Sequence, residues 1–332
     1  MLLLLASVAL AHPVGFEPGI DVLDEPFVSA ERCAVCHSDV VAEWASSRHA
    51  VAHSNPIYQQ GLRDEPMAFC VRCHSPLSEQ VRAIEPTVAE WAARPRSHRQ
   101  EVEDSSLAAS EGITCVVCHQ RDGRMLATED SGRSPHTVQV EPAMSGSEWC
   151  GSCHQFEMFR ASPLGVTFTG ELMQATLQEW QAWGGRSTCQ DCHMPDGAHT
   201  FAGAHDVEQL RASVHVRARP GRLRIRSLGV GHELPSGDLF RHITVRAFTD
   251  AGPVEVARFG RTWTVDQQTE VVVKRLAANT SLQPGEWREV KLPDGTLGWD
   301  VRYHYGSPFD EHRLQGDLEG WVVLLHAGDT RR

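Results

Sequence analysis

The cysteines of this chain occur only in Cys-x-x-Cys-His motifs. The motifs are Cys33/Cys36/His37, Cys70/Cys73/His74, Cys115/Cys118/His119, Cys150/Cys153/His154 and Cys189/Cys192/His193, and they use all ten cysteines. Residues i, i+3 and i+4 share one face of a helical turn, so both sulfurs and the imidazole can meet one flat ligand. This spacing attaches haem c, whose vinyl groups bind the sulfurs and whose iron binds the histidine. We therefore predict five covalently attached haem c groups, each with its iron.

Other uses of paired cysteines fit this pattern less well. Structural zinc sites do not require a histidine after every pair. A disulfide framework would distribute its cysteines to tie distant segments together, and a thioredoxin-like pair would occur once. The motifs begin at 33, 70, 115, 150 and 189, so they form a loose repeat that is too irregular for a solenoid.

The second axial side of each iron decides whether a haem carries electrons or binds a substrate. Thirteen of the 18 histidines lie outside the motifs. The candidates for this second, distal position are His49, His53, His98, His136, His199, His205 and His232. If residues 39–49 form an unbroken helix, His49 lies about 18 Å from His37. We therefore expect these two histidines to serve different haems.

Charge divides the chain into two halves. Residues 1–206 contain no lysine, 13 arginines and 27 acidic residues, a formal charge of −14, whereas residues 207–332 have a formal charge of +2. The acidic first half makes nucleic acid and anionic membrane surfaces poor partners. A basic redox partner protein suits it better.

The pattern predicts an exported protein with two domains. Residues 1–11 are apolar and end in Ala-Leu-Ala, which indicates a signal peptide and a periplasmic or extracellular location. No later apolar run is long enough for a transmembrane helix. Residues 12–206 are expected to form a mainly α or irregular pentahaem cytochrome domain, whose haems supply much of the core.

Residues 207–332 are expected to form an all-β, sandwich-like domain. Apolar and arginine residues alternate at 214–219 and 222–226, on either side of a Pro-Gly turn. Further strands are expected at 241–249, 254–264, 270–276, 286–292, 299–305 and 320–326. The arginine face of the first hairpin either docks on the acidic domain or faces solvent.

Several segments resemble the cytochrome c-554-like multihaem cytochromes. They are residues 33–50, Gly112–His119 and 179–206, and residues 231–237 resemble an element of the β-domain appended to many such proteins. The resemblance covers about residues 30–206 and implies closely stacked haems with two histidine ligands each. It implies distal ligation by His49, His199, His205 and His232. We add His136, in the segment Ser-Pro-His, as the fifth distal ligand.

Three functions remain open at this point. The first is electron transfer, in which the chain carries single electrons between redox partners and is not a catalyst. The second is an oxidoreductase that acts on a small nitrogen or sulfur compound at one open haem. The third is a subunit of an extracellular cytochrome filament, formed by self-association.

Overall fold

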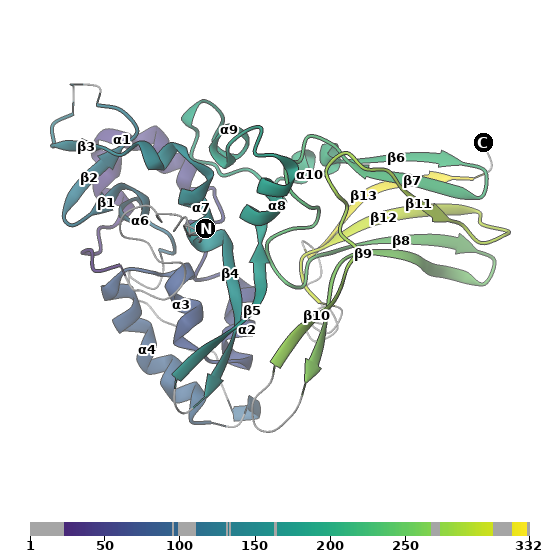
Figure 1. Ribbon diagram of the computed structural model, residues 1–332, viewed down its shortest axis with the longest axis horizontal. Helices are drawn as coiled ribbons and strands as arrows, with labels where there is room; N and C mark the ends of the chain where they lie inside the picture. Colours follow the sequence, from purple (N-terminus) through teal and green to yellow (C-terminus); the bar gives the residue numbers. More distant parts are fainter. Residues whose placement is uncertain are drawn as a thin grey trace, which may run out of the picture.

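The computed structural model describes residues 23–94, 96–98, 111–130, 132, 134–162, 165–266, 273–307 and 321–330. Helices dominate the first half of the chain, and two sheets dominate the second (Figure 1). The expected signal peptide lies outside the described residues. Within the described residues, no helix is both long enough and apolar enough to cross a membrane.

Each motif lies on a short helix. These helices are α1 (Ala30–Ala45), α3 (Ala68–His74), α6 (Cys115–His119), α7 (Ser147–His154) and α9 (Cys189–His193). Four of them end at the motif histidine. The exception is α1, which continues beyond its motif but bends at His37, where φ is −119° and ψ is 41°. The helical spacing expected of the motifs is therefore confirmed.

The remaining helices of this half are short and pack in small clusters. They are α2 (Pro56–Asp64), α4 (Ser78–Ala92), α8 (Thr176–Trp183) and α10 (Val207–Ser213), with 3-10 turns η1 (Arg96–His98), η2 (Pro142–Ser145) and η3 (Pro195–Gly197). One cluster joins α2, α3 and α4 through Leu62, Val71 and Ile84. Another brings together Trp44 and Ala50 with Phe201 and Cys115 at its edge. Such small clusters agree with a half whose core depends on bound haems.

A long hairpin in the first half departs from the expected helices and loops. Strands β4 (Gln155–Ser162) and β5 (Gly165–Ala175) pair antiparallel directly after the fourth motif. Phe69 of α3 packs against the hairpin through Phe156 and Phe168, with ring centres 6.0 and 6.1 Å away. A smaller sheet contains β1 (Gln120–Arg121), β2 (Arg124–Ala127) and β3 (Val138–Val140). Packing of α3 on the hairpin thus favours strands β4 and β5, which the local sequence pattern did not predict.

The second half contains two antiparallel sheets. The five-stranded sheet has the order β10 (Val273–Asn279), β9 (Gly252–Asp266), β8 (His242–Thr249), β12 (Gly298–His304) and β13 (Val322–Asp329). The three-stranded sheet has the order β11 (Arg288–Lys291), β7 (Arg222–Ser227) and β6 (Val214–Arg219). The strands expected from alternation are confirmed, with ends that differ by a few residues.

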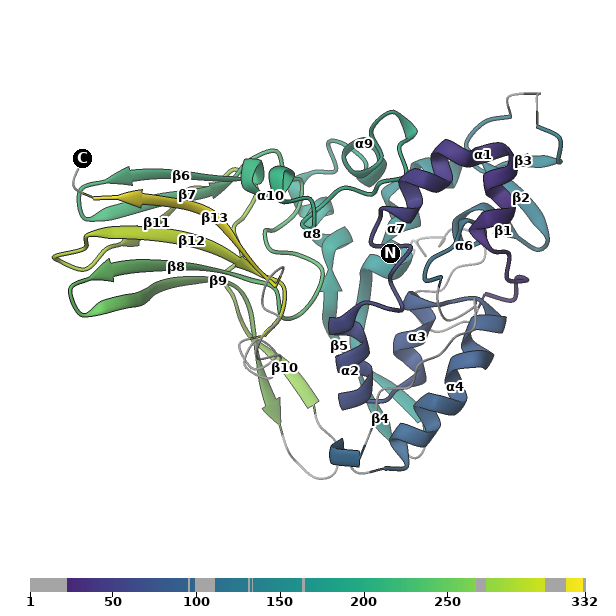
Figure 2. The same ribbon diagram turned by 180° about the vertical axis from the view of Figure 1, so that it is seen from behind.

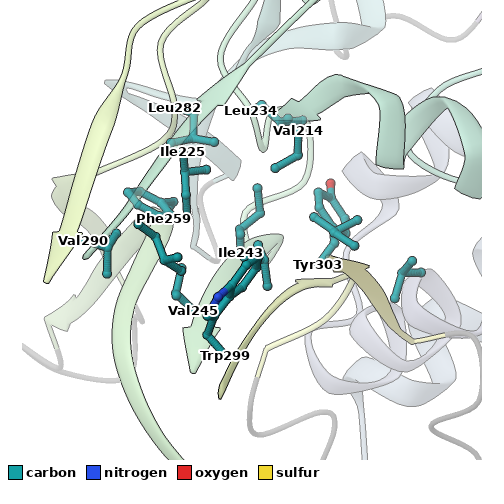
Figure 3. Packing of buried hydrophobic residues seen from close by; sticks show 14 of the residues in the cluster. Val214, Ile225, Leu234, Ile243, Val245, Phe259, Leu282, Val290, Trp299 and Tyr303 are labelled. Carbon is teal, nitrogen blue, oxygen red and sulfur yellow. The ribbon is translucent and has the colours of Figure 1, made fainter. Parts of the chain in front are cut away.

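One apolar core joins the two sheets (Figure 3). Ile225 and Val290 come from the three-stranded sheet, and Ile243, Phe259 and Tyr303 come from the five-stranded sheet. Two antiparallel sheets around a shared core agree with an all-β second half. Its status as a separate sandwich domain, divided from the first half at residue 207, stays a prediction. Helices α8 and α10 lie between the two halves in both views (Figures 1 and 2).

The arginine face of the β6–β7 hairpin does not dock on the helical half. The hairpin extends away from that half (Figures 1 and 2). Instead, the guanidinium groups of Arg217, Arg224 and Arg226 lie 4.9, 4.8 and 4.6 Å from the ring centre of Trp287. We call these four side chains the Arg–Trp cluster. They share the outer face of the three-stranded sheet, opposite its buried apolar residues.

Candidate haem-binding site

Four motif histidines each face a second imidazole at nearly the same distance. The ring centres are 6.4 Å apart for His37 and His136, 6.2 Å for His49 and His154, 6.1 Å for His119 and His199, and 6.3 Å for His193 and His232. Each pair joins a motif histidine to one of the expected distal candidates. His49 faces His154, in line with the expectation that it serves a different haem from His37. The unbroken helix considered for residues 39–49 is not present, because α1 ends at Ala45.

This distance fits an iron shared by two imidazoles. Metal–nitrogen bonds of about 2 Å on both sides of an iron leave about 6 Å between the two ring centres. Directly stacked rings lie closer together, as His242 and His304 of the second half show with centres 4.3 Å apart. The donor set fits as well, because a pair of cysteines accompanies each motif histidine. The residues present therefore fit four haems with two histidine ligands each.

Two motif cysteines, Cys36 and Cys192, differ from the others in exposure. Both are exposed, whereas the other motif cysteines are partly buried. Both depart from the expected arrangement, in which the two sulfurs of a motif lie together in the site. Next to Cys36, α1 leaves helical geometry at His37, and the neighbouring Val35 is 84% exposed. The sequence showed the spacing of Cys36 but not this exposure, and its thioether stays a prediction.

Hydrogen bonds donated by Nδ1 orient many of these imidazoles. Nδ1 of His74, His119 and His193 donates to the backbone oxygens of residues 52, 126 and 202 at 2.8, 3.0 and 2.5 Å. His199 and His232 donate in the same way to residues 197 and 233. A proton held on Nδ1 leaves the lone pair of Nε2 for a metal. The same bond occurs at His242, so it supports ligation only together with the spacing.

Burial keeps several of these imidazoles neutral. It lowers the pKa of His49 to about 4 and that of His154 to about 3. It also lowers the pKa of His74, His119 and His232. Imidazole binds iron in its neutral form, so these histidines are ready ligands at neutral pH.

Close backbone packing places His49 beside the third motif. The amide of Ile113 donates to the carbonyl of His49 at 2.9 Å. A Cβ atom on Gly112 would lie 2.6 Å from the same carbonyl oxygen, so only glycine fits there. The carboxylate of Glu43 accepts from the backbone amide of His199 at 2.8 Å. The segment before α6 thus positions His49, which faces the fourth motif, and helix α1 positions His199, which faces the third.

The histidine of the second motif has different surroundings. The ring of Tyr58 stacks on His74, with ring centres 3.8 Å apart and planes 12° apart. Among the described residues, no imidazole faces His74 at the spacing of the four pairs. The phenol oxygen of Tyr58 is buried without a hydrogen-bond partner. His53, another candidate, is buried beside Tyr58, with ring centres 5.6 Å apart.

His205 does not face a motif histidine in the described residues. Its ring stacks on Tyr305, with ring centres 4.4 Å apart and planes 7° apart. The Tyr305 hydroxyl donates to the carbonyl of Ala204 at 2.5 Å, so the second half holds this segment. The expectation that His205 is a distal ligand therefore does not agree with its position. His98 is exposed and pairs with the neighbouring Ser97.

Contacts between cysteines show which motifs are neighbours. The thiols of Cys33 and Cys115, of Cys73 and Cys153, and of Cys150 and Cys189 lie close enough to change each other's pKa, and Cys118 senses the charge of Cys153. The fourth motif therefore lies beside the second and fifth motifs and near the third, and the third lies beside the first.

Two aromatic residues of the site have no separate signal in the sequence. Tyr58 lies on a helix without a motif, and Phe201 lies two residues after His199. The ring of Phe201 lies 4.3 Å from that of His49 and 5.8 Å from that of His199. The position of Phe201 between two candidate ligands, His199 and His205, is the one cue that the sequence offers.

Comparison with known proteins identifies the first half. Residues 25–206 match the family described as outer membrane cytochrome MtrC/MtrF-like, domains II/IV. The C-type polyheme cytochrome OmcC of Geobacter sulfurreducens is 26% identical in an alignment of length 157 that covers 44% of this chain and 20% of that protein. The multiheme cytochrome MtrA of Shewanella baltica is 23% identical in an alignment of length 210 that covers 58% of this chain and 55% of that protein. The chain thus spans a fifth and about half of these two relatives.

A solved structure shares the fold over nearly the whole chain. It is a penta-heme cytochrome c552 from Thermochromatium tepidum, with a TM-score of 0.63 and 22% identity, and the match covers 90% of this chain and 97% of that one. At this identity the likeness shows the fold alone. The resemblance to cytochrome c-554-like proteins is finer than these matches and stays a prediction. Because the family match covers more than half of the 332 residues, the chain belongs to the MtrC/MtrF-like multihaem cytochromes.

Proposed function

We propose that this chain binds five haem c groups and carries single electrons between redox proteins. The observation that supports this most strongly is the set of four histidine pairs with ring centres 6.1–6.4 Å apart. When bound, each haem supplies an iron that exchanges one electron at a potential set by its ligands and surroundings. Histidines on both axial sides leave no position for a substrate, which favours a carrier over a catalyst.

The proposed ligand set follows the geometry of these pairs. All ten motif cysteines, the exposed Cys36 included, would form thioethers. His37/His136, His154/His49, His119/His199 and His193/His232 would hold four irons, and His74 would hold the fifth from one side. His205 is left out of the set because its ring stacks on Tyr305.

The contacts between motifs support electron transfer across the whole set. The fourth motif lies beside the second and fifth motifs and near the third, and the third lies beside the first. An electron that enters at the first motif would therefore reach the second or fifth through shared neighbours. This arrangement suits a carrier with more than one point of entry or exit.

The matched family and relatives support a location outside the cytoplasm. The family description names outer membrane cytochromes, and MtrA and OmcC are multihaem cytochromes. We propose a periplasmic or extracellular location for this chain. Its acidic first half, with a formal charge of −14, suits a partner with a basic surface.

Electron paramagnetic resonance of the oxidised protein, with a pyridine haemochrome count, tests the proposal. We expect five haems per chain and low-spin signals from at least four. His199→Ala should convert one low-spin haem to high-spin, because it removes a proposed ligand. His205→Ala is the matched control and should leave the low-spin count unchanged. The ligand set is wrong if the two variants behave alike.

One observation favours a second function at the second motif. His74 is the motif histidine without a facing imidazole in the described residues, so its iron could bind a small molecule. The reaction would be the reduction or oxidation of a small nitrogen or sulfur compound. A high-spin signal that changes on addition of nitrite or hydroxylamine would support this function. Five low-spin haems whose signals do not change with either compound would exclude this second function.

A further inference from the structure

One short segment contacts three of the haem-binding sites. His199 faces His119 of the third motif. Two residues later, the ring of Phe201 packs on His49, which faces the histidine of the fourth motif. The next carbonyl, that of residue 202, accepts a hydrogen bond from His193 of the fifth motif. Residues 199–202 therefore meet the third, fourth and fifth motifs within four positions.

The backbone at Phe201 explains how this is possible. Its φ is +47°, in the left-handed region that bulky residues rarely adopt. Such a conformation is strained and persists when the surroundings enforce it. Here it turns the Phe201 ring towards His49 while the following carbonyl reaches His193.

The contacts of the Phe201 ring are specific. The ring meets His49 nearly edge-on, at 70° and 4.3 Å, and meets His199 at 84° and 5.8 Å. It also packs in the cluster of Trp44 and Ala50, beside Cys115 of the third motif. An edge-on ring restricts rotation of the imidazole that it touches. One side chain thus restrains an imidazole in each of two ligand pairs.

We propose that Phe201 is a positioning residue that fixes the planes of the His49 and His199 imidazoles and so tunes two neighbouring haems together. The inference rests on the proposed ligand set, in which these histidines serve the fourth and third motifs. The ring also covers part of each imidazole. Both effects influence haem potential, because ligand orientation and solvent exposure set the energy of the oxidised and reduced irons.

The test compares two variants of the haem-loaded protein. Phe201→Leu keeps an apolar side chain but removes the ring, and Phe201→Tyr keeps the ring. In Phe201→Leu we expect the low-spin resonance signals of two haems to shift and their potentials to fall, since water stabilises the oxidised iron. The other haem signals should stay in place. Phe201→Tyr should restore the wild-type spectrum.

Trp287→Leu is the matched control. It removes an aromatic ring from the Arg–Trp cluster of the second half, which contains no residue of the proposed ligand set. This variant should leave all haem signals unchanged. The proposal is overturned if Phe201→Leu lowers thermal stability but moves no haem signal, or if it shifts every signal. It is also overturned if Trp287→Leu produces the same change.

A failure of the ligand set would look different. In that case His49→Ala and His199→Ala would each leave the low-spin count at the wild-type value, whatever the result for Phe201. If both histidine variants each produce one high-spin haem while Phe201→Leu shifts nothing, the ligand set stands and the role of Phe201 is wrong. If Phe201→Leu does not load haem, Phe201→Met replaces it as the variant without a ring. The proposal then requires that Phe201→Met shifts the signals of two haems and that Phe201→Tyr keeps the wild-type spectrum.

Discussion

Glu179 is a carboxyl buried where the two halves meet. It lies on α8, pairs with Arg261 of β9 and accepts a hydrogen bond from the Ser236 hydroxyl at 2.5 Å. Burial raises its pKa from 4.5 to about 7, although Arg261 and Ser236 oppose the change. The nearby carboxylate of Glu233 raises it further.

This pKa makes the stability of the protein depend on pH. The folded pKa lies above the unfolded value, so the contribution of Glu179 is fully present below about pH 4.5 and is lost as pH rises through 7. The difference between the two values corresponds to at most about 3 kcal/mol. Glu179→Gln mimics the protonated acid. We expect it to match the wild type near pH 4.5 and to be more stable by up to that amount at pH 8.

Guanidinium unfolding of the haem-loaded protein, followed by circular dichroism at pH 5 and pH 8, measures this difference. Glu255→Gln is the control, because Glu255 and Arg258 form a more exposed pair on β9. It should change stability by less than about 1 kcal/mol at either pH. If Glu179→Gln is less stable than the wild type at pH 8 and equal to it at pH 5, the ion pair with Arg261 outweighs burial and the reasoning is refuted.

Two further predictions concern packing and charge. Gly112→Ala should destabilise the protein by at least about 1–3 kcal/mol and disturb the haem served by His49, because the new methyl would clash with that backbone; thermal unfolding and resonance spectra measure both effects. Gly61 lies in helix α2, where an added Cβ atom would have no other atom within 4 Å. Gly61→Ala should therefore stabilise the protein by about 0.5–1 kcal/mol. Salt should raise the melting temperature by screening repulsion in the Arg–Trp cluster, and Arg224→Gln should reduce that rise. An equal salt response in both proteins would show that this repulsion does not affect stability.

Local patterns predicted much of this molecule. The motif spacing placed each pair of cysteines and its histidine on one helical turn, and alternation located the strands of the second half. In Arg222–Ser227, the buried Leu223 and Ile225 alternate with arginines that are more exposed. These features depend on neighbours in sequence, so the sequence reveals them directly.

Pairings between distant residues were harder to predict. His136 and His205 were both candidates, and nothing local separates them. His136 lies opposite His37, whereas Tyr305, a hundred positions further along the chain, holds the ring of His205. The exposure of Cys36 was not predicted either, because its motif has the same pattern as the other four although α1 bends at His37. For the histidines, the deciding feature is how remote parts of the chain pack, as with Phe69 and the unexpected β4–β5 hairpin.

In the proposed ligand set, the four histidine pairs would also act on the unfolded chain. His49 and His154 are about 100 residues apart in sequence, so an iron that binds both closes a loop of that length. In the chain-entropy model of a disulfide, such a closure stabilises the folded state by about 4–5 kcal/mol. An imidazole–iron bond differs from a disulfide because acid can open it by protonating the ligand. The loaded chain would therefore be a cross-linked polymer whose links are covalent at the cysteines and reversible at the histidines.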